Sequence, residues 1–159
     1  MQTLLPLAEA VAARLKARGE TLAVAESAAG GLISAALLAQ AGASAYYRGG
    51  AVVYTGAARQ ALMGVTAADM VTLRPSTEEY VLMMARTARI RLESTWALAE
   101  SGATGPSGNR YGDAAGHACL AVSGPVERML TLETGHGDRV ANMRAFATTA
   151  LTLLEECLR

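Results

Sequence analysis

The sequence predicts a three-layer α/β/α sandwich built on a mixed, mostly parallel β-sheet. Short apolar segments typical of strands alternate along the chain with segments of helical periodicity, and the strand segments are apolar enough to be covered on both faces. The last two strand segments are joined only by Ser123-Gly-Pro125, which is too short for a helical crossover. These two strands should therefore form an antiparallel hairpin, which makes the sheet mixed.

The elements follow from local patterns. Leu4, Val11 and Leu15 recur at helical spacing, and Gly19 ends this first helix. Ser76 with Glu79 forms a capping-box pattern that predicts the start of another helix. The other predicted elements are strands over 21–25, 51–54, 95–100, 117–122 and 126–133, helices over 29–40 and 139–158, and a helical turn or two over 57–63.

Composition and charge exclude several classes of function. The 159 residues suit a single domain, 1–159, that can bury a core. The formal net charge of zero argues against a nucleic acid or a membrane surface as partner, and no apolar run approaches the roughly 20 residues of a membrane helix. The N-terminus lacks the pattern of a signal peptide, and Cys119 and Cys157 lack metal-ligand spacing. We therefore expect a cytoplasmic protein with no metal or other cofactor.

The stretch Thr21–Gly31 is the main candidate for chemistry. It reads as a buried strand, a tight turn with Glu26 and Ser27, and a helix that opens on two glycines. The first backbone N–H groups of a helix lack partners within it, and small residues let a ligand approach them closely. Ser27 would then be a hydroxyl beside an oxyanion-binding turn. A simpler alternative is that Ser27 only caps the helix.

A glycine-rich loop forms the second candidate. The segment Ser101–Arg110 follows a predicted strand, and ligands of open α/β sheets bind beyond the carboxyl ends of the strands. Its glycines and polar groups favour a phosphate or a sugar as ligand, although such a loop is also common as a structural turn. It matches neither the GxGxxG pattern nor the Walker loop, which ends in Lys-Ser or Lys-Thr.

Four short segments in a fixed order carry a family resemblance. They are Ala25-Glu-Ser-Ala-Ala-Gly-Gly31, Val53-Tyr-Thr-Gly-Ala-Ala-Arg59 followed by Met63-Gly-Val65, Ser101-Gly-Ala-Thr-Gly-Pro106, and Gly137-Asp-Arg139. Together they resemble the CinA C-terminal family, also called the nicotinamide-nucleotide amidohydrolase family, along nearly the whole chain. The resemblance implies an α/β/α domain that is usually oligomeric and that converts nicotinamide mononucleotide and water into nicotinate mononucleotide and ammonia.

The resemblance also implies roles for individual residues. The nucleophile position of the family is Ser27, the tyrosine of the second segment is Tyr54, and the position of the activating lysine is Arg59. The backbone N–H groups from Ala29 to Gly31 are the expected oxyanion donors. The expected substrate-binding residues are Glu26, Ala29, Gly30, Gly31, Ser101, Gly102, Thr104, Gly105, Asn109 and Arg139.

The sequence departs from the family pattern at three places. Arg59 replaces the lysine, and a guanidinium does not give up its proton in a protein. Ala29 replaces a threonine, and Asp113-Ala-Ala-Gly116 replaces a Lys-Pro-x-Gly segment. The only lysine of the chain, Lys16, is expected in the first helix, away from the site.

Other groups are candidates for moving the proton or holding a phosphate. His117 titrates near neutrality, but a lone histidine is more often a structural or surface residue. A buried Glu26 is a base if its pKa is raised, and a structural Glu26 that accepts hydrogen bonds from backbone amides is at least as common. Tyr54 is a candidate relay or a packed strand-end residue. Arg139, and with less support Arg110 and Arg48, are candidates for a phosphate contact or for surface ion pairs.

Three interpretations of function remain open. The first is an amidohydrolase with an altered proton-transfer arrangement, acting on nicotinamide mononucleotide or a related amide. The second is a catalytically silent nucleotide-binding module in which Arg59 is an extra anion contact. The third is a structural, oligomer-forming domain without a ligand. The expected partners are therefore a small-molecule nucleotide or amide and further copies of the chain.

Overall fold

The computed structural model describes residues 1–159 and contains one five-stranded sheet. The strands are β1 (Leu22–Glu26), β2 (Tyr47–Val52), β3 (Trp96–Gly102), β4 (His117–Ser123) and β5 (Arg128–Glu133), in the spatial order β2-β1-β3-β4-β5. β1 pairs with β2 and β3 in parallel, whereas β4 is antiparallel to both β3 and β5. Only β4 therefore runs against the other strands, which confirms the predicted mixed sheet and its terminal hairpin.

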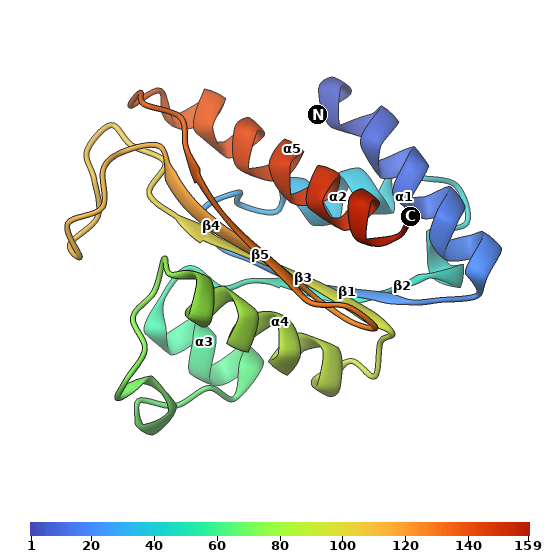
Figure 1. Cartoon of the computed structure of the whole chain (residues 1–159), viewed down its shortest axis with the longest axis horizontal. Helices are drawn as coiled ribbons and strands as arrows, with labels where there is room; N and C mark the ends of the chain where they lie inside the picture. Colours follow the sequence, from blue (N-terminus) through green and yellow to red (C-terminus); the bar gives the residue numbers. More distant parts are fainter.

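Helices cover both faces of this sheet (Figure 1). α1 (Leu5–Arg18), α2 (Leu32–Leu38) and α5 (Arg139–Cys157) lie on one face, and α3 (Gly56–Met63) and α4 (Glu78–Arg91) lie on the other. Short 3₁₀ turns occur at Gln2–Leu4, Ala43–Ala45 and Ala68–Met70. The predicted three-layer α/β/α architecture is confirmed. No helix is long and apolar enough to span a bilayer.

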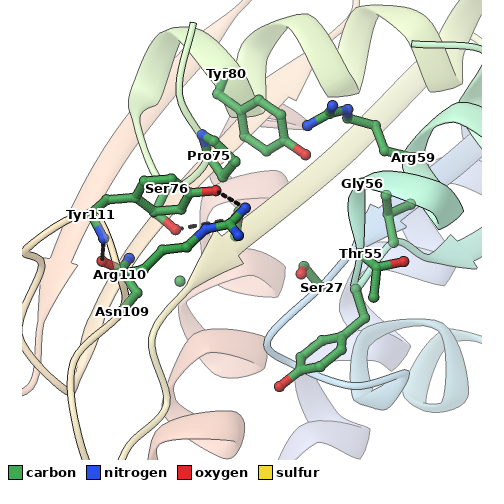
Figure 2. Close-up of a pocket in the computed structure, with 14 residues that line it drawn as sticks. Ser27, Thr55, Gly56, Arg59, Pro75, Ser76, Tyr80, Asn109, Arg110 and Tyr111 are labelled. Carbon is green, nitrogen blue, oxygen red and sulfur yellow. Dashed lines mark hydrogen bonds between the residues drawn. The ribbon is translucent and has the colours of Figure 1, made fainter. Parts of the chain in front are cut away.

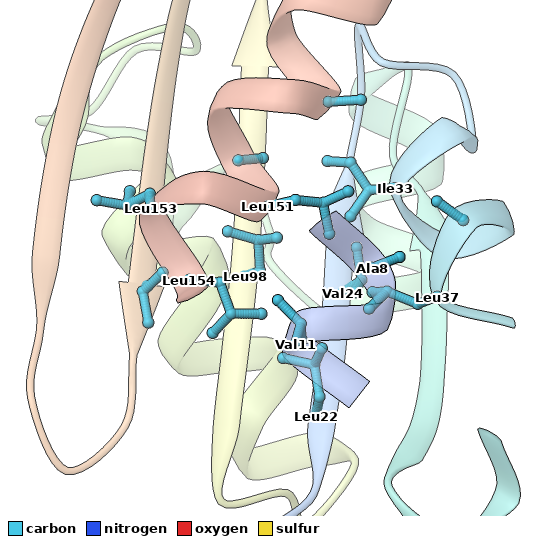
Figure 3. Packing of buried hydrophobic residues seen from close by; sticks show 14 of the residues in the cluster. Ala8, Val11, Leu22, Val24, Ile33, Leu37, Leu98, Leu151, Leu153 and Leu154 are labelled. Carbon is cyan, nitrogen blue, oxygen red and sulfur yellow. The ribbon is translucent and has the colours of Figure 1, made fainter. Parts of the chain in front are cut away.

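The two faces of the sheet carry side chains of different size. Leu22 and Val24 of β1 and Leu98 of β3 point toward α1, α2 and α5, where they join a large buried cluster with Leu151 and Leu154 of α5 (Figure 3). The alternate residues face α3 and α4 in a separate buried cluster, and most of them are alanines: Ala23, Ala25, Ala97, Ala99 and Ala121. Strand periodicity thus gives one thick apolar layer and one thin one.

Several element boundaries differ from those expected. The helix predicted from residue 29 begins only at Leu32, because Gly30 and Gly31 have φ values of 67° and 96° and form a turn. α4 is capped by Thr77, whose hydroxyl accepts a hydrogen bond from the Tyr80 amide at 3.3 Å. The predicted capping role of Ser76 is therefore wrong by one residue. Ser76 is instead buried, with a φ of 61°.

The fold brings three loops to one edge of the sheet. β1, β2 and β3 run in parallel, so the turn after β1, the segment after β2 and the glycine-rich loop after β3 meet at their carboxyl ends. β2 begins at Tyr47, earlier than predicted, because its two glycines continue the pairing with β1. The start of α4 closes this region from the alanine face.

Candidate active site

A cavity of about 590 Å³ opens where these loops meet (Figure 2). The segment after β2, the glycine-rich loop and the start of α4 supply most of its wall, and Ser27 comes from the turn after β1. The lining residues are Ser27, Val53, Tyr54, Thr55, Gly56, Arg59, Pro75, Ser76, Tyr80, Ser101, Gly102, Asn109, Arg110 and Tyr111. Among them only Arg59 and Arg110 carry a formal charge at neutral pH, so the cavity favours an anionic ligand.

Glu26 supports the turn behind the cavity. Its side chain is fully buried, and its carboxylate accepts hydrogen bonds from the backbone N–H groups of Gly31, Ile33 and Ser34 at 2.9–3.1 Å, and one from the Ser34 hydroxyl. These N–H groups belong to the start of α2, where a negative charge is stabilised. Glu26 therefore anchors α2 and does not line the cavity, and its contact with substrate stays a prediction.

A second buried carboxylate, Glu100 of β3, lies beneath Ser27. Its Oε2 accepts hydrogen bonds from the backbone N–H groups of Ser27 at 3.0 Å and Ala29 at 2.9 Å. Burial raises the pKa of Glu100 to about 7, although the hydrogen bonds that it accepts from backbone N–H groups act to lower this pKa. Its other oxygen, Oε1, is buried without a hydrogen-bond partner. The N–H groups of the turn after β1 therefore donate to a carboxylate of the protein itself, Glu100.

The predicted oxyanion donors all have hydrogen-bond partners within the protein. The N–H of Ala29 is bonded to Glu100, that of Gly30 to the Ser27 carbonyl at 3.1 Å, and that of Gly31 to Glu26. A backbone N–H has one hydrogen to donate, so none of the three is free to hold a developing oxyanion. The predicted role of Ala29, Gly30 and Gly31 in substrate binding therefore stays a prediction, and their N–H groups are occupied within the protein in this structure.

Arg59 and Tyr80 form one wall of the cavity. Figure 2 shows the Arg59 guanidinium directed toward the Tyr80 hydroxyl. Burial raises the pKa of the Tyr80 phenol, and the nearby charge of Arg59 opposes that rise. The Nε of Arg59 also lies 3.5 Å from the Val65 carbonyl oxygen, and the guanidinium has no carboxylate partner. Arg59 thus offers the cavity a fixed positive charge and no basic nitrogen.

Arg110 reaches the cavity from the glycine-rich loop (Figure 2). Its guanidinium donates to the Tyr111 hydroxyl at 2.9 Å and lies over the Tyr111 ring. Arg74 lies 5.7 Å from the centre of the same ring and forms a bidentate ion pair with Asp113. Asn109 accepts from the backbone N–H groups of Tyr111 and Asp113, which stiffens the loop. Arg110 itself has no carboxylate partner, so its charge is available to a ligand.

Tyr54 and Arg139 meet beside the cavity. The Arg139 guanidinium donates to the Tyr54 hydroxyl at 3.2 Å and to the Gly105 carbonyl oxygen at 2.8 Å. Arg139 therefore connects α5 to both the segment after β2 and the glycine-rich loop. It holds two parts of the wall together, although it does not line the cavity itself.

His117 is held by acceptors on both sides. Its Nδ1 lies 2.5 Å from a Glu133 carboxylate oxygen, and its Nε2 lies 3.0 Å from the Ser76 carbonyl oxygen. Burial lowers the pKa of His117, but the hydrogen bonds to Glu133 and Ser76, together with the charge of Asp113, produce a net rise. Both ring nitrogens are engaged with these acceptors, and His117 does not line the cavity, so the geometry does not support His117 as a general base.

The comparison with known proteins identifies the family. The CinA C-terminal domain profile matches residues 4–158. The chain belongs to the CinA C-terminal domain family. A CinA-like protein of Anaeromyxobacter dehalogenans is 37% identical over 153 residues, or 96% of this chain and 38% of that protein. A CinA-like protein of Parasynechococcus marenigrum is 38% identical over 153 residues, or 96% of this chain and 36% of that protein. The chain spans a little over a third of the length of these relatives.

Solved structures give the same result for the fold. A competence-damaged protein (CinA) superfamily protein from Klebsiella pneumoniae aligns with a TM-score of 0.90 at 30% identity, covering 98% of this chain and 97% of that one. A protein of the same superfamily from Enterobacter cloacae also has a TM-score of 0.90, at 29% identity, with 98% and 92% coverage. The predicted family and fold are both confirmed.

The structure of this CinA C-terminal domain brings together part of the predicted site. Ser27, Tyr54, Arg59, Ser101, Gly102 and Asn109 line the cavity, whereas Glu26, Ala29, Gly30, Gly31, Thr104, Gly105 and Arg139 do not. Thr104 is buried, and its carbonyl oxygen accepts from the Asn142 side chain at 2.9 Å, so it ties the loop to α5. Gly105 lies against the backbone of Gly137, which leaves no room for a side chain. These residues shape the wall behind the cavity.

The sequence reasoning missed five polar residues of the site. Ser76, Tyr80, Tyr111 and Thr55 line the cavity, and Glu100 holds the Ser27 turn. A signal for Glu100 was present, because it is a charged residue in an otherwise apolar strand, and a buried charge requires compensation. No comparable signal marks Tyr80 or Ser76, whose positions depend on how α4 packs. No group of three or more His, Cys, Asp or Glu side chains is placed to hold a metal ion.

Proposed function

We propose that this protein hydrolyses the carboxamide of nicotinamide mononucleotide or a closely related nucleotide amide, with Ser27 as the nucleophile. One observation carries the proposal: Ser27 lines a cavity of about 590 Å³ in which both charged side chains are arginines without a carboxylate partner. A cavity of this size accommodates a mononucleotide, and its charge matches a phosphate group. Membership of the CinA C-terminal domain family supports the choice of substrate.

In the proposed reaction the Ser27 hydroxyl oxygen attacks the carboxamide carbon. The carbon–nitrogen bond breaks, ammonia leaves with the transferred proton, and an ester remains on Ser27. Water then hydrolyses this ester to release the carboxylate product and restore the hydroxyl. Arg59 or Arg110 stabilises the negative oxygen of the intermediate, since the N–H groups of the turn after β1 are occupied. Tyr54, whose hydroxyl accepts a hydrogen bond from Arg139, is the proposed proton relay.

A second candidate function is a catalytically silent nucleotide-binding module. The observation that favours it concerns the candidate bases: Arg59 remains protonated, and both nitrogens of His117 lie beside acceptor oxygens of Glu133 and Ser76 rather than beside Ser27. In that case Arg59 and Arg110 bind the phosphate, and no bond is broken. A homo-oligomeric state and a cytoplasmic location belong to both versions of the proposal.

The test is ammonia release from nicotinamide mononucleotide by the purified protein, with Ser27→Ala and Arg59→Lys measured in parallel. Turnover in the parent that is lost in Ser27→Ala supports the hydrolase. No turnover in the parent but activity in Arg59→Lys supports the binding module, because a lysine restores a group that can accept a proton. No turnover in any of the three, together with no binding of the nucleotide by calorimetry, contradicts both candidates.

A further inference from the structure

Glu100 occupies an unusual position for a buried carboxylate. It is only 2% exposed, and Oε2 alone holds both the Ser27 and the Ala29 N–H groups, while Oε1 has no partner. Glu26 on the neighbouring strand provides a contrast, because its two oxygens share four hydrogen bonds at the start of α2. Glu100 is thus the less satisfied of the two, and its hydrogen bonds lie at the candidate nucleophile itself.

No cation neutralises Glu100. It takes part in no ion pair, and the ionisable groups that influence or face it are Glu26 from β1 and Tyr80 from α4. Glu26 carries the same charge and disfavours ionisation of Glu100, and Tyr80 bears a neutral phenol with the Arg59 guanidinium beside it (Figure 2). Burial is the largest influence and raises the pKa of Glu100 to about 7, so both protonation states are populated near neutral pH.

The protonation state affects the hydrogen bonds under Ser27. An ionised carboxylate accepts from an N–H group about twice as strongly as a neutral acceptor does. One of these amides belongs to Ser27, whose side chain lines the cavity, and the other belongs to Ala29, two residues along the same turn. A change in these two bonds therefore acts on the orientation of Ser27 without a direct contact between Glu100 and the substrate.

We propose that Glu100 is a positioning residue for Ser27: its ionised carboxylate fixes the turn after β1 in the geometry that presents the hydroxyl to the cavity, and protonation loosens that turn. This inference rests on the proposed role of Ser27 as nucleophile. If Glu100 acts in this way, the activity rises with pH through the neutral range, and ionisation of Glu100 causes the rise. In the proposed reaction Tyr54, and not Glu100, relays the Ser27 proton.

The first test compares the parent with Glu100→Gln, and with Glu9→Gln as a control, because Glu9 is an exposed glutamate on α1 without a hydrogen-bond partner. kcat and KM for nicotinamide mononucleotide are measured between about pH 5.5 and pH 9. In the parent we expect kcat to rise with an apparent midpoint near 7. In Glu100→Gln we expect this rise of kcat with pH to disappear. At the highest pH values kcat should be about 10²-fold lower than in the parent, with KM nearly unchanged. A Glu100→Gln protein whose kcat still rises with pH as in the parent overturns the proposal.

The second test does not depend on turnover. The backbone ¹H–¹⁵N resonances of Ser27 and Ala29 are followed across the same pH range in the parent and in Glu100→Gln. Titration of both amides near pH 7 in the parent and in Glu9→Gln, but not in Glu100→Gln, supports positioning. It does so even if no ammonia is released, in which case the hydrolase proposal alone fails. Amides that do not titrate, or that titrate equally in Glu100→Gln, overturn the inference. Circular dichroism confirms that each variant is folded.

Discussion

Glu26 and Glu100 are neighbouring buried carboxylates with different environments. The pairing of Ala25 with Ala99 places the two glutamates side by side, at the end of β1 and two residues before the end of β3. Glu26 is fully hydrogen-bonded at a helix start, whereas Glu100 retains an unpartnered oxygen. At the scale of single residues, this difference makes Glu100 the group whose ionisation opposes folding.

We predict that Glu100 makes the protein less stable as the pH rises. Its pKa rises from 4.5 to about 7 on folding, so the folded state binds more protons than the unfolded state between these values. Its contribution is therefore fully present below about pH 4.5 and is lost as the pH rises through about 7. The total change is roughly 3 kcal/mol.

The measurement is urea unfolding at several pH values between about 5 and 8, for the parent and for Glu100→Gln. The difference in unfolding free energy between the two proteins should move in favour of Glu100→Gln as the pH rises. Other titrating groups are common to both proteins, so their effects cancel in the difference. Parallel pH dependences would show that Glu100 has the same pKa in both states.

Arg110 provides a second prediction at this scale. Its guanidinium is held over Tyr111 at the cavity and lacks a carboxylate partner. We expect Arg110→Gln to weaken the binding of nicotinamide mononucleotide by about 10- to 100-fold, the usual loss for a hydrogen bond between charged groups. Nicotinamide riboside, which lacks the phosphate, should show little difference between parent and variant.

Isothermal titration calorimetry gives both affinities. Arg144→Gln is the matched control, because Arg144 is an exposed arginine on α5 with no ion pair. An equal loss of affinity for the nucleoside and the nucleotide would assign Arg110 to another part of the ligand.

At the scale of elements, the sequence predicts best where the pattern is continuous. The apolar segments of β1, β3 and β4 and the long periodic helix α5 agree with the structure closely. The start of α2 was misplaced because Gly30 and Gly31 adopt left-handed φ values that two adjacent glycines permit but do not require. The part of the site contributed by the three strand ends was likewise foreseeable, whereas Tyr80 reaches the cavity only through the packing of α4.

The cap of α4 gives a test of one such boundary. Thr77 accepts from the Tyr80 amide, whereas Ser76 has a φ of 61°, a conformation that costs a non-glycine residue energy. We expect Thr77→Ala to lower the unfolding free energy by about 1 kcal/mol. Ser76→Gly should leave it unchanged or raise it by up to about 1 kcal/mol.

Chemical denaturation of the two variants and the parent gives the three unfolding free energies and shows which residue caps α4. If Ser76 were the cap, as the capping-box pattern implies, the two effects would be exchanged. Because Ser76 also lines the cavity, only stability is compared in this experiment.

At the scale of the whole molecule, β2 leaves one edge of the sheet unpaired. It pairs only with β1, and Val52, Tyr54 and Leu62 in and after this strand are large apolar residues between 43% and 63% exposed. Unpaired strand edges with exposed apolar side chains commonly pair with another chain. We therefore predict a homo-oligomer, and light scattering coupled to gel filtration should give a multiple of 16.4 kDa. A mass of one chain at every concentration would contradict this.

The thin alanine face of the sheet has a consequence for how this domain can change. α4 rests on the methyl groups of Ala23, Ala25, Ala97 and Ala99, and the same helix carries Tyr80 to the cavity. A larger side chain on that face would press against α4, which carries Tyr80, without a substitution in any residue that lines the cavity. Because a close-packed interior transmits strain, small changes of volume on the alanine face are a route by which the cavity wall can be altered.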